Sequence, residues 1–513
     1  MSSLALALVL INANVVTEAP AHPHASVVAL AGERITYVGD DVSQARTAAG
    51  ASAEVIDLEG KTMVPGFNDA HVHFGMSITL GGDGAFDFHD DSRADFLRSL
   101  EKAAAERPGS TWLFIKTERI PDKLKERDLD AFARPIFVVS GHGGQLNHLA
   151  IERGGFTLAE APQGFIRGRA LAAAIDRVVK HLPADTLRLR AIEFLRKLSS
   201  YGITSVQLID ELPELFESLR REGLLTARVR MIPLGYRFET KEYTSRWNGP
   251  APEWLRVDGV KYFHDDWARM SKAEVREIFT HTIEASRKVV VHILSRHALS
   301  SFLDMLEPLF RVHPEASKLF RFDHVDEVRF DDYQRLKKMG IIVCSNPSML
   351  PEWRDPVAFP MRSLANAGIR TCIGTDWVGT HIPPRTLSPI ESMALAVTHG
   401  GFGDQETVSP EAALEAYTVG SATAEGEELE KGSIQKGKLG DLVVLSQDPR
   451  TVPAKEIEKT RVLLTVVGGK IVFRDGPFAS ETGGPTIGKP IKPPPTTIRP
   501  AEVPGSDSKA RKK

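Results

Sequence analysis

The chain has 513 residues, of which 64 are basic and 67 acidic, and its formal net charge is −3. A hydrophobic content of 42% and a charged content of 26% are typical of a soluble globular protein, and the mixed charges argue against a nucleic-acid-binding surface. The two cysteines, Cys344 and Cys372, exclude a disulfide framework and indicate a reducing compartment. Because no apolar run approaches the roughly 18 residues of a membrane-spanning helix, we expect a cytoplasmic protein without a membrane partner.

The first 63 residues consist of short β-type runs separated by turn residues, and similar runs return near the other end. The predicted strands are Ala7–Ile11, Asn14–Thr17, Ser26–Leu30, Arg34–Val38, Asp441–Leu445 and a single run over Val462–Phe473. We therefore expect the two ends of the chain to meet in one small sheet domain. Residues 486–513 are rich in proline and lysine and are expected to form a poorly ordered tail.

The most informative stretch is Val64–Phe74, which contains His71-Val72-His73. Strand side chains alternate between faces, so an extended backbone would point both imidazoles towards one metal ion and Val72 the other way. A histidine pair with this spacing is weak evidence alone, and a structural role is the alternative. Further His and Asp residues at predicted strand ends favour the metal site.

A segment from about 75 to 200 is too long for a plain connection between a strand and a helix, and is expected to be an insertion over the site. Within it, Gly141–Asn147 follows the predicted strand Pro135–Val139. Glycines permit close approach of a ligand, so His142 is expected to polarise a carbonyl group or to orient the substrate. An ordinary loop histidine is the alternative.

The rest of the middle alternates apolar, strand-like runs with amphipathic segments at Asp185–Leu198 and Ser271–Arg287. This alternation favours a parallel α/β barrel. A doubly wound sheet is the competing architecture, but no glycine-rich phosphate fingerprint follows an early strand. The predicted strands are Ser205–Ile209, Val229–Ile232, Gly259–Phe263, Lys288–His292, Phe320–His324, Ile341–Cys344 and Arg370–Gly374.

His292, His324 and Asp376 end or follow such strands, where barrel enzymes place their active sites. Together with His71 and His73 they form a set of imidazoles and a carboxylate that suits zinc with an open position for water. The ion would generate a hydroxide nucleophile near neutral pH. The alternatives are satisfied core histidines and a helix N-cap at Asp376.

Lys261 lies inside a predicted strand, where burial would lower the pKa of its amine. A neutral amine can combine with carbon dioxide, and the resulting carbamate can bridge two metal ions. The alternative is a surface lysine or one paired with Asp265 or Asp266.

Several motifs occur in an order that resembles the metal-dependent amidohydrolase superfamily, and specifically the branch that includes N-substituted formamide deformylase. The similarity extends from residue 5 to about residue 475. The motifs are Pro65–His73, Gly141–Asn147, Gly259–Lys261, Val290–His292, Arg321–His324, Gly374–Trp377, Ala416–Thr418 and Gly432–Leu445.

This resemblance implies a TIM (β/α)8 barrel over residues 64–429 and a composite β-sandwich built from residues 1–63 and 430–480. It also implies hydrolysis of a non-peptide C–N bond in an amide, N-formyl or cyclic amide substrate. One departure is the sequence Ile293-Leu294 after His292, where the branch usually has Gly-Asp.

By position, the resemblance assigns His71 and His73 to one metal ion and His292 and His324 to a second. Lys261 would bridge the ions as a carbamate, and Asp376 would ligate metal and shuttle the proton. One or two divalent ions, zinc first among them, and a small-molecule substrate are the expected partners, with a homo-oligomer left open. A lyase, isomerase or decarboxylase on the same barrel and a catalytically silent binding protein are the alternatives.

Overall fold

The computed structural model describes residues 7–479 except for 76–84, 89–91, 107–110, 118, 123, 141–142, 158, 168–170, 172–173, 176, 179–183, 210–211, 234–250, 258, 264–270 and 378–384. Residues 1–479 form one unit and residues 480–513 another. The second unit contains the predicted tail and lies outside the described residues.

The two ends of the chain share a sheet. Strands β2 (Asn14–Val16), β3 (His24–Ala25) and β7 (Thr62–Pro65) combine with β22 (Leu442–Leu445), β23 (Val462–Val467) and β24 (Lys470–Arg474) in the order β24-β23-β22-β7-β2-β3. A run predicted as one strand over 462–473 is instead the hairpin β23–β24, because Gly468 and Gly469 turn the chain with φ of 54° and 71°.

A second sheet at the N-terminal end packs against this one. It has the order β5-β4-β1-β6 and consists of β1 (Ala7–Ile11), β4 (Val27–Ala31), β5 (Arg34–Gly39) and β6 (Glu54–Asp57). Apolar side chains of both sheets share one core, in which Leu8 and Leu30 meet Leu442 and Leu464. Helix α1 (Val42–Ala49) covers the outer face through Ala45.

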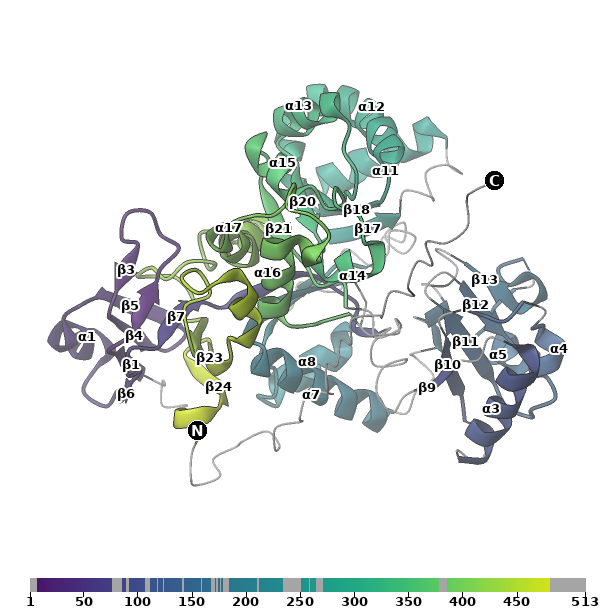
Figure 1. The fold of residues 1–513 in the computed structure, drawn as a ribbon, viewed down its shortest axis with the longest axis horizontal. Coiled ribbons are helices and arrows are strands. Elements are labelled where there is room, and N and C mark those ends of the chain that lie inside the picture. Colours follow the sequence, from purple (N-terminus) through teal and green to yellow (C-terminus); the bar gives the residue numbers. More distant parts are fainter. Residues whose placement is uncertain are drawn as a thin grey trace, which may run out of the picture. The chain divides into compact units, whose positions relative to one another are not determined.

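The middle of the chain forms two parallel sheets that follow the predicted alternation of strands and helices (Figure 1). One contains β8 (Phe67–Val72), β14 (Ile203–Leu208), β15 (Arg228–Met231) and β16 (Leu255–Val257). The other contains β17 (Gly259–Phe263), β18 (Lys288–Ile293), β19 (Phe320–His324), β20 (Ile342–Ser345) and β21 (Thr371–Ile373).

These two sheets touch at both edges. At one edge Val72, at the end of β8, forms a parallel bridge with Trp377 beyond β21. At the other, the Lys261 amide donates to the Pro233 carbonyl over 2.7 Å. The carboxyl ends of both sheets therefore face a common region.

Amphipathic helices cover the parallel strands. Helix α12 (Arg296–Val312) is capped by the Ser295 hydroxyl, which accepts from the Ala298 amide, and its apolar stripe packs with the strands of the second sheet. The other helices here are α7 (Ala184–Ser200), α8 (Pro213–Arg221), α11 (Lys272–Glu284), α13 (Phe330–Met339), α14 (Leu350–Trp353), α15 (Met361–Asn366), α16 (Pro389–Thr398), α17 (Pro410–Glu415) and α18 (Ser421–Glu425). Among the described residues, no helix is long and apolar enough to cross a bilayer.

The segment predicted as an insertion contains its own sheet, of order β13-β12-β11-β10-β9. Strands β9 (Ala85–Phe88), β10 (Leu113–Thr117) and β11 (Ile136–Ser140) are parallel, while β12 (Gly143–Leu146) and β13 (Phe165–Ile166) complete it antiparallel. Helices α3 (Arg93–Glu106), α4 (Glu126–Leu129) and α5 (His148–Arg153) lie beside it (Figure 1). Ile115 packs with α3, whereas Phe137 joins the main core that includes Phe74.

Candidate metal centre

Three potential ligand atoms converge at the end of β8. The Nε2 atoms of His71 and His73 lie 3.1 Å apart, and each is 3.3 Å from Oδ1 of Asp376. All three atoms lie within 4.8 Å of one another, a spacing suited to one metal ion. Val72 between the histidines is buried, as the alternation of an extended strand requires.

The backbone around Asp376 explains how this carboxylate reaches β8. Its amide donates to the His71 carbonyl over 2.8 Å, and its φ of 47° is left-handed. A Cβ atom on Gly374 would lie 2.5 Å from the His71 Cβ, so only glycine fits where these two segments meet. The buried Asp69 carboxylate accepts from the His71 amide (3.1 Å) and the Thr375 amide (3.0 Å) and thereby ties the two segments together.

His292 and His324 form the other half of a continuous group of imidazoles. Their ring centroids are 4.4 Å apart, and His324 lies 5.1 Å from His71. His324 has a φ of 73°, a conformation that is rare outside glycine and that recurs at functional sites. Its buried Nδ1 atom has no hydrogen-bond partner, which argues against a satisfied core histidine.

Burial keeps these imidazoles neutral. Desolvation, reinforced by the Lys261 charge, lowers the pKa of His71 to about 4 and that of His292 to about 3. Desolvation also lowers the pKa of His324 well below its usual value. A neutral imidazole offers the nitrogen lone pair that a metal ion requires.

Lys261 is buried, and its amine forms an ion pair with Asp323. The alternative partners Asp265 and Asp266 lie outside the described residues. Burial lowers the pKa of Lys261, although the Asp323 charge opposes that shift. For Asp323, burial favours the neutral acid, but Arg321 and Lys261 outweigh it and hold the carboxyl pKa well below its usual value.

Asp323 is one of two important side chains that sequence reasoning missed. Its Oδ2 atom lies 2.8 Å from Nδ1 of His71, and its Oδ1 atom accepts from Nε of Arg321 over 2.7 Å. The sequence places Asp323 directly before His324, and this proximity could have indicated a role in the site. Strand alternation argued against it, because neighbouring residues of a regular strand face opposite ways.

Arg385 is the second. Its Nη1 atom donates to Oδ2 of Asp376, while Nε and Nη2 donate to the Glu352 carboxylate over 2.8 and 2.9 Å. Burial alone would raise the pKa of Asp376, but Arg385 and His71 hold it well below its usual value. No sequence pattern indicated this arginine, which lies nine positions beyond its partner.

Two further acceptors at neighbouring strand ends are buried without partners. Both carboxylate oxygens of Asp326, after β19, lack a hydrogen bond, and burial raises the pKa of this group to about 8. Asn346, after β20, donates to the Gly374 carbonyl over 2.7 Å, and its Oδ1 atom is unpartnered. Such atoms call for a donor that a bound molecule can supply.

His142, which was predicted to polarise a carbonyl group or to orient the substrate, lies outside the described residues. The Trp377 ring stacks on Phe194 of α7 at 5.9 Å, with Lys197 Nζ 4.8 Å from its centroid. Trp353 is partly exposed and contacts Phe359.

Comparison with known proteins gives consistent results. The N-substituted formamide deformylase of Arthrobacter pascens is 27% identical to the chain, covering 91% of this chain and 98% of the relative. An uncharacterized metal-dependent hydrolase from Pyrococcus furiosus has a TM-score of 0.68 at 23% identity, covering 87% of this chain and 100% of the other. Atrazine chlorohydrolase from Arthrobacter aurescens, solved with zinc, has a TM-score of 0.56 at 16% identity, covering 91% and 95%. At such identities, the two solved structures establish similarity of fold.

Residues 54–473 match the amidohydrolase family, a range that includes all the site residues described above. The match therefore confirms the resemblance seen in the motifs around His71, His324 and Asp376. We conclude that the chain belongs to the amidohydrolase family and is an enzyme that acts on carbon–nitrogen bonds other than peptide bonds.

Proposed function

We propose that this protein is a zinc-dependent hydrolase that cleaves an amide, N-formyl or cyclic amide bond of a small molecule. The observation that carries the proposal is the convergence of His71, His73 and Asp376, whose ligand atoms lie within 4.8 Å of one another. The relative from Arthrobacter pascens, named for its action on N-substituted formamides, supports this class of bond.

The proposal includes closure of the parallel strands into a (β/α)8 barrel over residues 64–429, flanked by a composite β-sandwich from residues 1–63 and 430–480. Its support is the pair of links at Val72–Trp377 and Lys261–Pro233, which join the two parallel sheets at both edges. In such a barrel, all the proposed ligands lie at the carboxyl-end face, where the fold holds its active site.

The donor atoms fit a divalent cation. Nδ1 of His71 lies 2.8 Å from Asp323, so the proton belongs on Nδ1 and the Nε2 atom presents a lone pair. That lone pair faces Nε2 of His73 and Oδ1 of Asp376, so a cation between them would have three ligand atoms within reach. Two imidazoles and a carboxylate suit zinc. Such an ion supplies a water of lowered pKa and polarises the scissile carbonyl.

A second ion would use His292 and His324, whose rings lie 4.4 Å apart, with Lys261 bridging as a carbamate. Carboxylation would replace the Lys261 cation by an anion beside Asp323. The positive charge of Arg321, which donates to the Asp323 carboxylate over 2.7 Å, would remain beside these two anions. Carbon-13 NMR of protein equilibrated with labelled bicarbonate tests the carbamate, because Lys261→Met must remove its signal.

Asp376 is proposed as the proton carrier. Its low pKa keeps it ionised at rest, with Oδ2 held by Arg385 and Oδ1 directed towards the imidazoles. It would accept the proton of the attacking water and return it to the leaving nitrogen as the C–N bond breaks, a role worth about 10²–10⁴-fold. His142 is proposed to assist the developing oxyanion.

The test uses the full-length, zinc-loaded protein and a panel of N-formyl amines, N-acyl amines, cyclic imides and esters in ¹⁸O-labelled water. Hydrolysis must place solvent oxygen in the product, whereas a lyase or isomerase would not. Asp376→Asn should retain the fold and most of the metal but nearly abolish turnover, and His71→Ala should lose metal by elemental analysis. Unchanged metal in His71→Ala, or full activity in Asp376→Asn, would contradict the assignment.

A further inference from the structure

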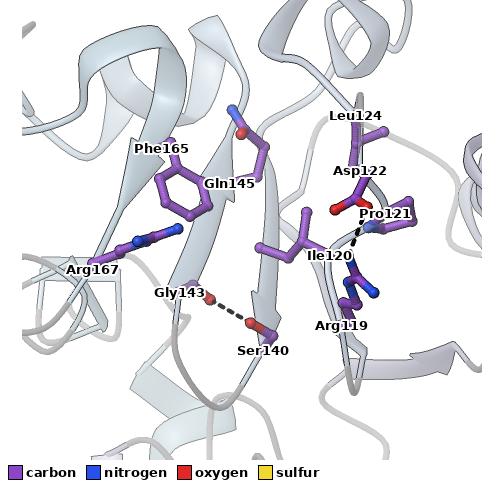
Figure 2. Close-up of a pocket in the computed structure, with 10 residues that line it drawn as sticks. All are labelled: Arg119, Ile120, Pro121, Asp122, Leu124, Ser140, Gly143, Gln145, Phe165 and Arg167. Atoms are coloured by element: carbon purple, nitrogen blue, oxygen red, sulfur yellow. Dashed lines mark hydrogen bonds and ion pairs between the residues drawn. The ribbon is translucent and has the colours of Figure 1, made fainter.

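The insertion sheet carries a pocket whose lining includes none of the proposed metal ligands. The cavity has a volume of about 540 Å³. Figure 2 shows the residues that line it. Ser140 ends β11, and Arg119–Leu124 follow β10, so the pocket lies beyond the carboxyl ends of two parallel strands. Open α/β sheets bind their ligands in this position, and the volume falls within the usual range for small-molecule sites.

Arg167 supplies an uncommitted positive charge on one side. Its guanidinium lies over the Phe165 ring at 4.8 Å, and none of the carboxylates in the described part of the chain pairs with it (Figure 2). Arg177 offers an instructive contrast: it lies over Phe156 at 5.0 Å in the same way, but Glu160 accepts from it over 2.6 Å. The stacking orients both arginines, yet among the described residues Arg167 has no carboxylate partner, so its donors can face a ligand.

Arg119 lies on the opposite side and is partly neutralised. Its Nη2 atom donates to Asp122 over 2.6 Å, as Figure 2 shows. The charged lining of Arg119, Asp122 and Arg167 therefore sums to one positive charge. Between them, Gln145 is fixed by donating to the Gln163 carbonyl over 2.9 Å.

The remaining lining is largely apolar. Ile120 projects between the two arginines, and Pro121 and Leu124 continue that surface (Figure 2). The Phe165 ring lies against Gly143, where an added Cβ would be 3.1 Å from it. A flat apolar group could therefore rest between this ring and Ile120.

We propose that this pocket binds a small-molecule carboxylate that carries a flat apolar or aromatic group. A carboxylate matches the planar, two-pronged donor edge of Arg167. One net positive charge suits a monoanion better than a phosphate dianion, which would leave charge unbalanced.

The experiment titrates benzoate into the full-length, metal-loaded protein and measures binding by calorimetry and saturation-transfer NMR. Benzyl alcohol, benzylamine and inorganic phosphate serve as comparison probes. Arg167→Gln should weaken benzoate binding by about tenfold or more, and Arg167→Lys by less, because lysine keeps the charge but not the paired donors. Arg177→Gln is the matched control and should leave binding unchanged.

Binding must also persist after the metal is removed with a chelator, because a carboxylate can ligate a metal ion directly. Loss of benzoate binding on chelation would overturn the proposal and assign the probe to the metal centre. Equal binding to wild type and Arg167→Gln, or preference for phosphate or benzylamine over benzoate, would also overturn it. Because these readouts do not depend on turnover, failure here is distinguishable from failure of the proposed hydrolase activity.

Discussion

Replacement of Gly374 by alanine tests whether the close approach of the segment after β21 to β8 sets the geometry of the centre. Gly374 has a φ outside the left-handed region, so alanine is compatible with the backbone conformation itself. The obstacle is space alone: the new Cβ would lie 2.5 Å from the His71 Cβ, 2.6 Å from its amide nitrogen and 2.9 Å from its Cα.

Carbon atoms in ordinary contact are about 3.5–4.0 Å apart, so the segments must separate by about 1 Å. Rotation of a side chain cannot relieve this, because two of the three contacts are with backbone atoms. Overpacking of this kind costs about 1–3 kcal/mol of unfolding free energy. Ligand distances in metal sites tolerate only about 0.2 Å, and a 1 Å displacement costs about 100-fold in turnover.

We therefore expect Gly374→Ala to lower the unfolding free energy, to bind less zinc and to lose about 100-fold in kcat. Urea denaturation, elemental analysis and steady-state kinetics measure the three quantities. Gly340→Ala is the control, because its φ of 66° strains an alanine while the nearest atom to the new Cβ is 3.6 Å away. It should lose about 1 kcal/mol but keep metal and activity. Wild-type zinc content and kcat in Gly374→Ala would refute the reasoning.

Three other results are expected. In the wild type, Nε of Arg228 donates to the buried Asp441 carboxylate over 2.7 Å. Arg228→Met removes this charged partner and should cost about 3–5 kcal/mol of unfolding free energy, measured by denaturant unfolding. Burial, followed by the Glu415 charge, raises the pKa of Glu18 from 4.5 to about 7. The folded state therefore holds this proton more tightly than the unfolded state, and stability falls as the pH rises from 4.5 to 7. Glu18→Gln should remove this fall, which is about 1–2 kcal/mol after screening, and a pH series of Tm values measures it. Chelation should abolish turnover and lower Tm, with zinc restoring both.

Hydrophobic pattern alone predicted most strands of the fold, because a buried parallel strand is a continuous apolar run. Phe320–His324 and Gly259–Phe263 agree residue for residue with β19 and β17. The pattern did not reveal the turn at Gly468, since apolar residues continue on both sides of it. The hydrophobic pattern also does not predict that Gly374 lies against His71, because that contact joins segments some 300 positions apart in the sequence.

Within the site, the sequence predicted His71, His73, His324 and Asp376 from their places at strand ends, but it did not predict Asp323. His71 and His73 follow simple alternation. Asp323 and His324 are adjacent, and a regular strand would direct them to opposite faces. The φ of 73° at His324 breaks that rule, so both side chains reach His71: Asp323 at 2.8 Å and His324 at 5.1 Å between ring centroids. Nothing in the local sequence signals such a conformation at a histidine.

The orientation of His71 depends on charges buried beneath it. Asp323 contacts its Nδ1, which leaves the Nε2 lone pair directed at His73 and Asp376. Asp323 stays ionised because Arg321 donates to it, and Arg321 in turn donates to Gln207 of β14 across the strands. The proposed metal site is thus oriented from inside the fold as well as from its loops. Arg321 is buried three residues before His324 ends β19, and its ion pair with Asp323 offsets the cost of burying its charge. Through Asp323, this arginine helps to fix the tautomer of the His71 imidazole.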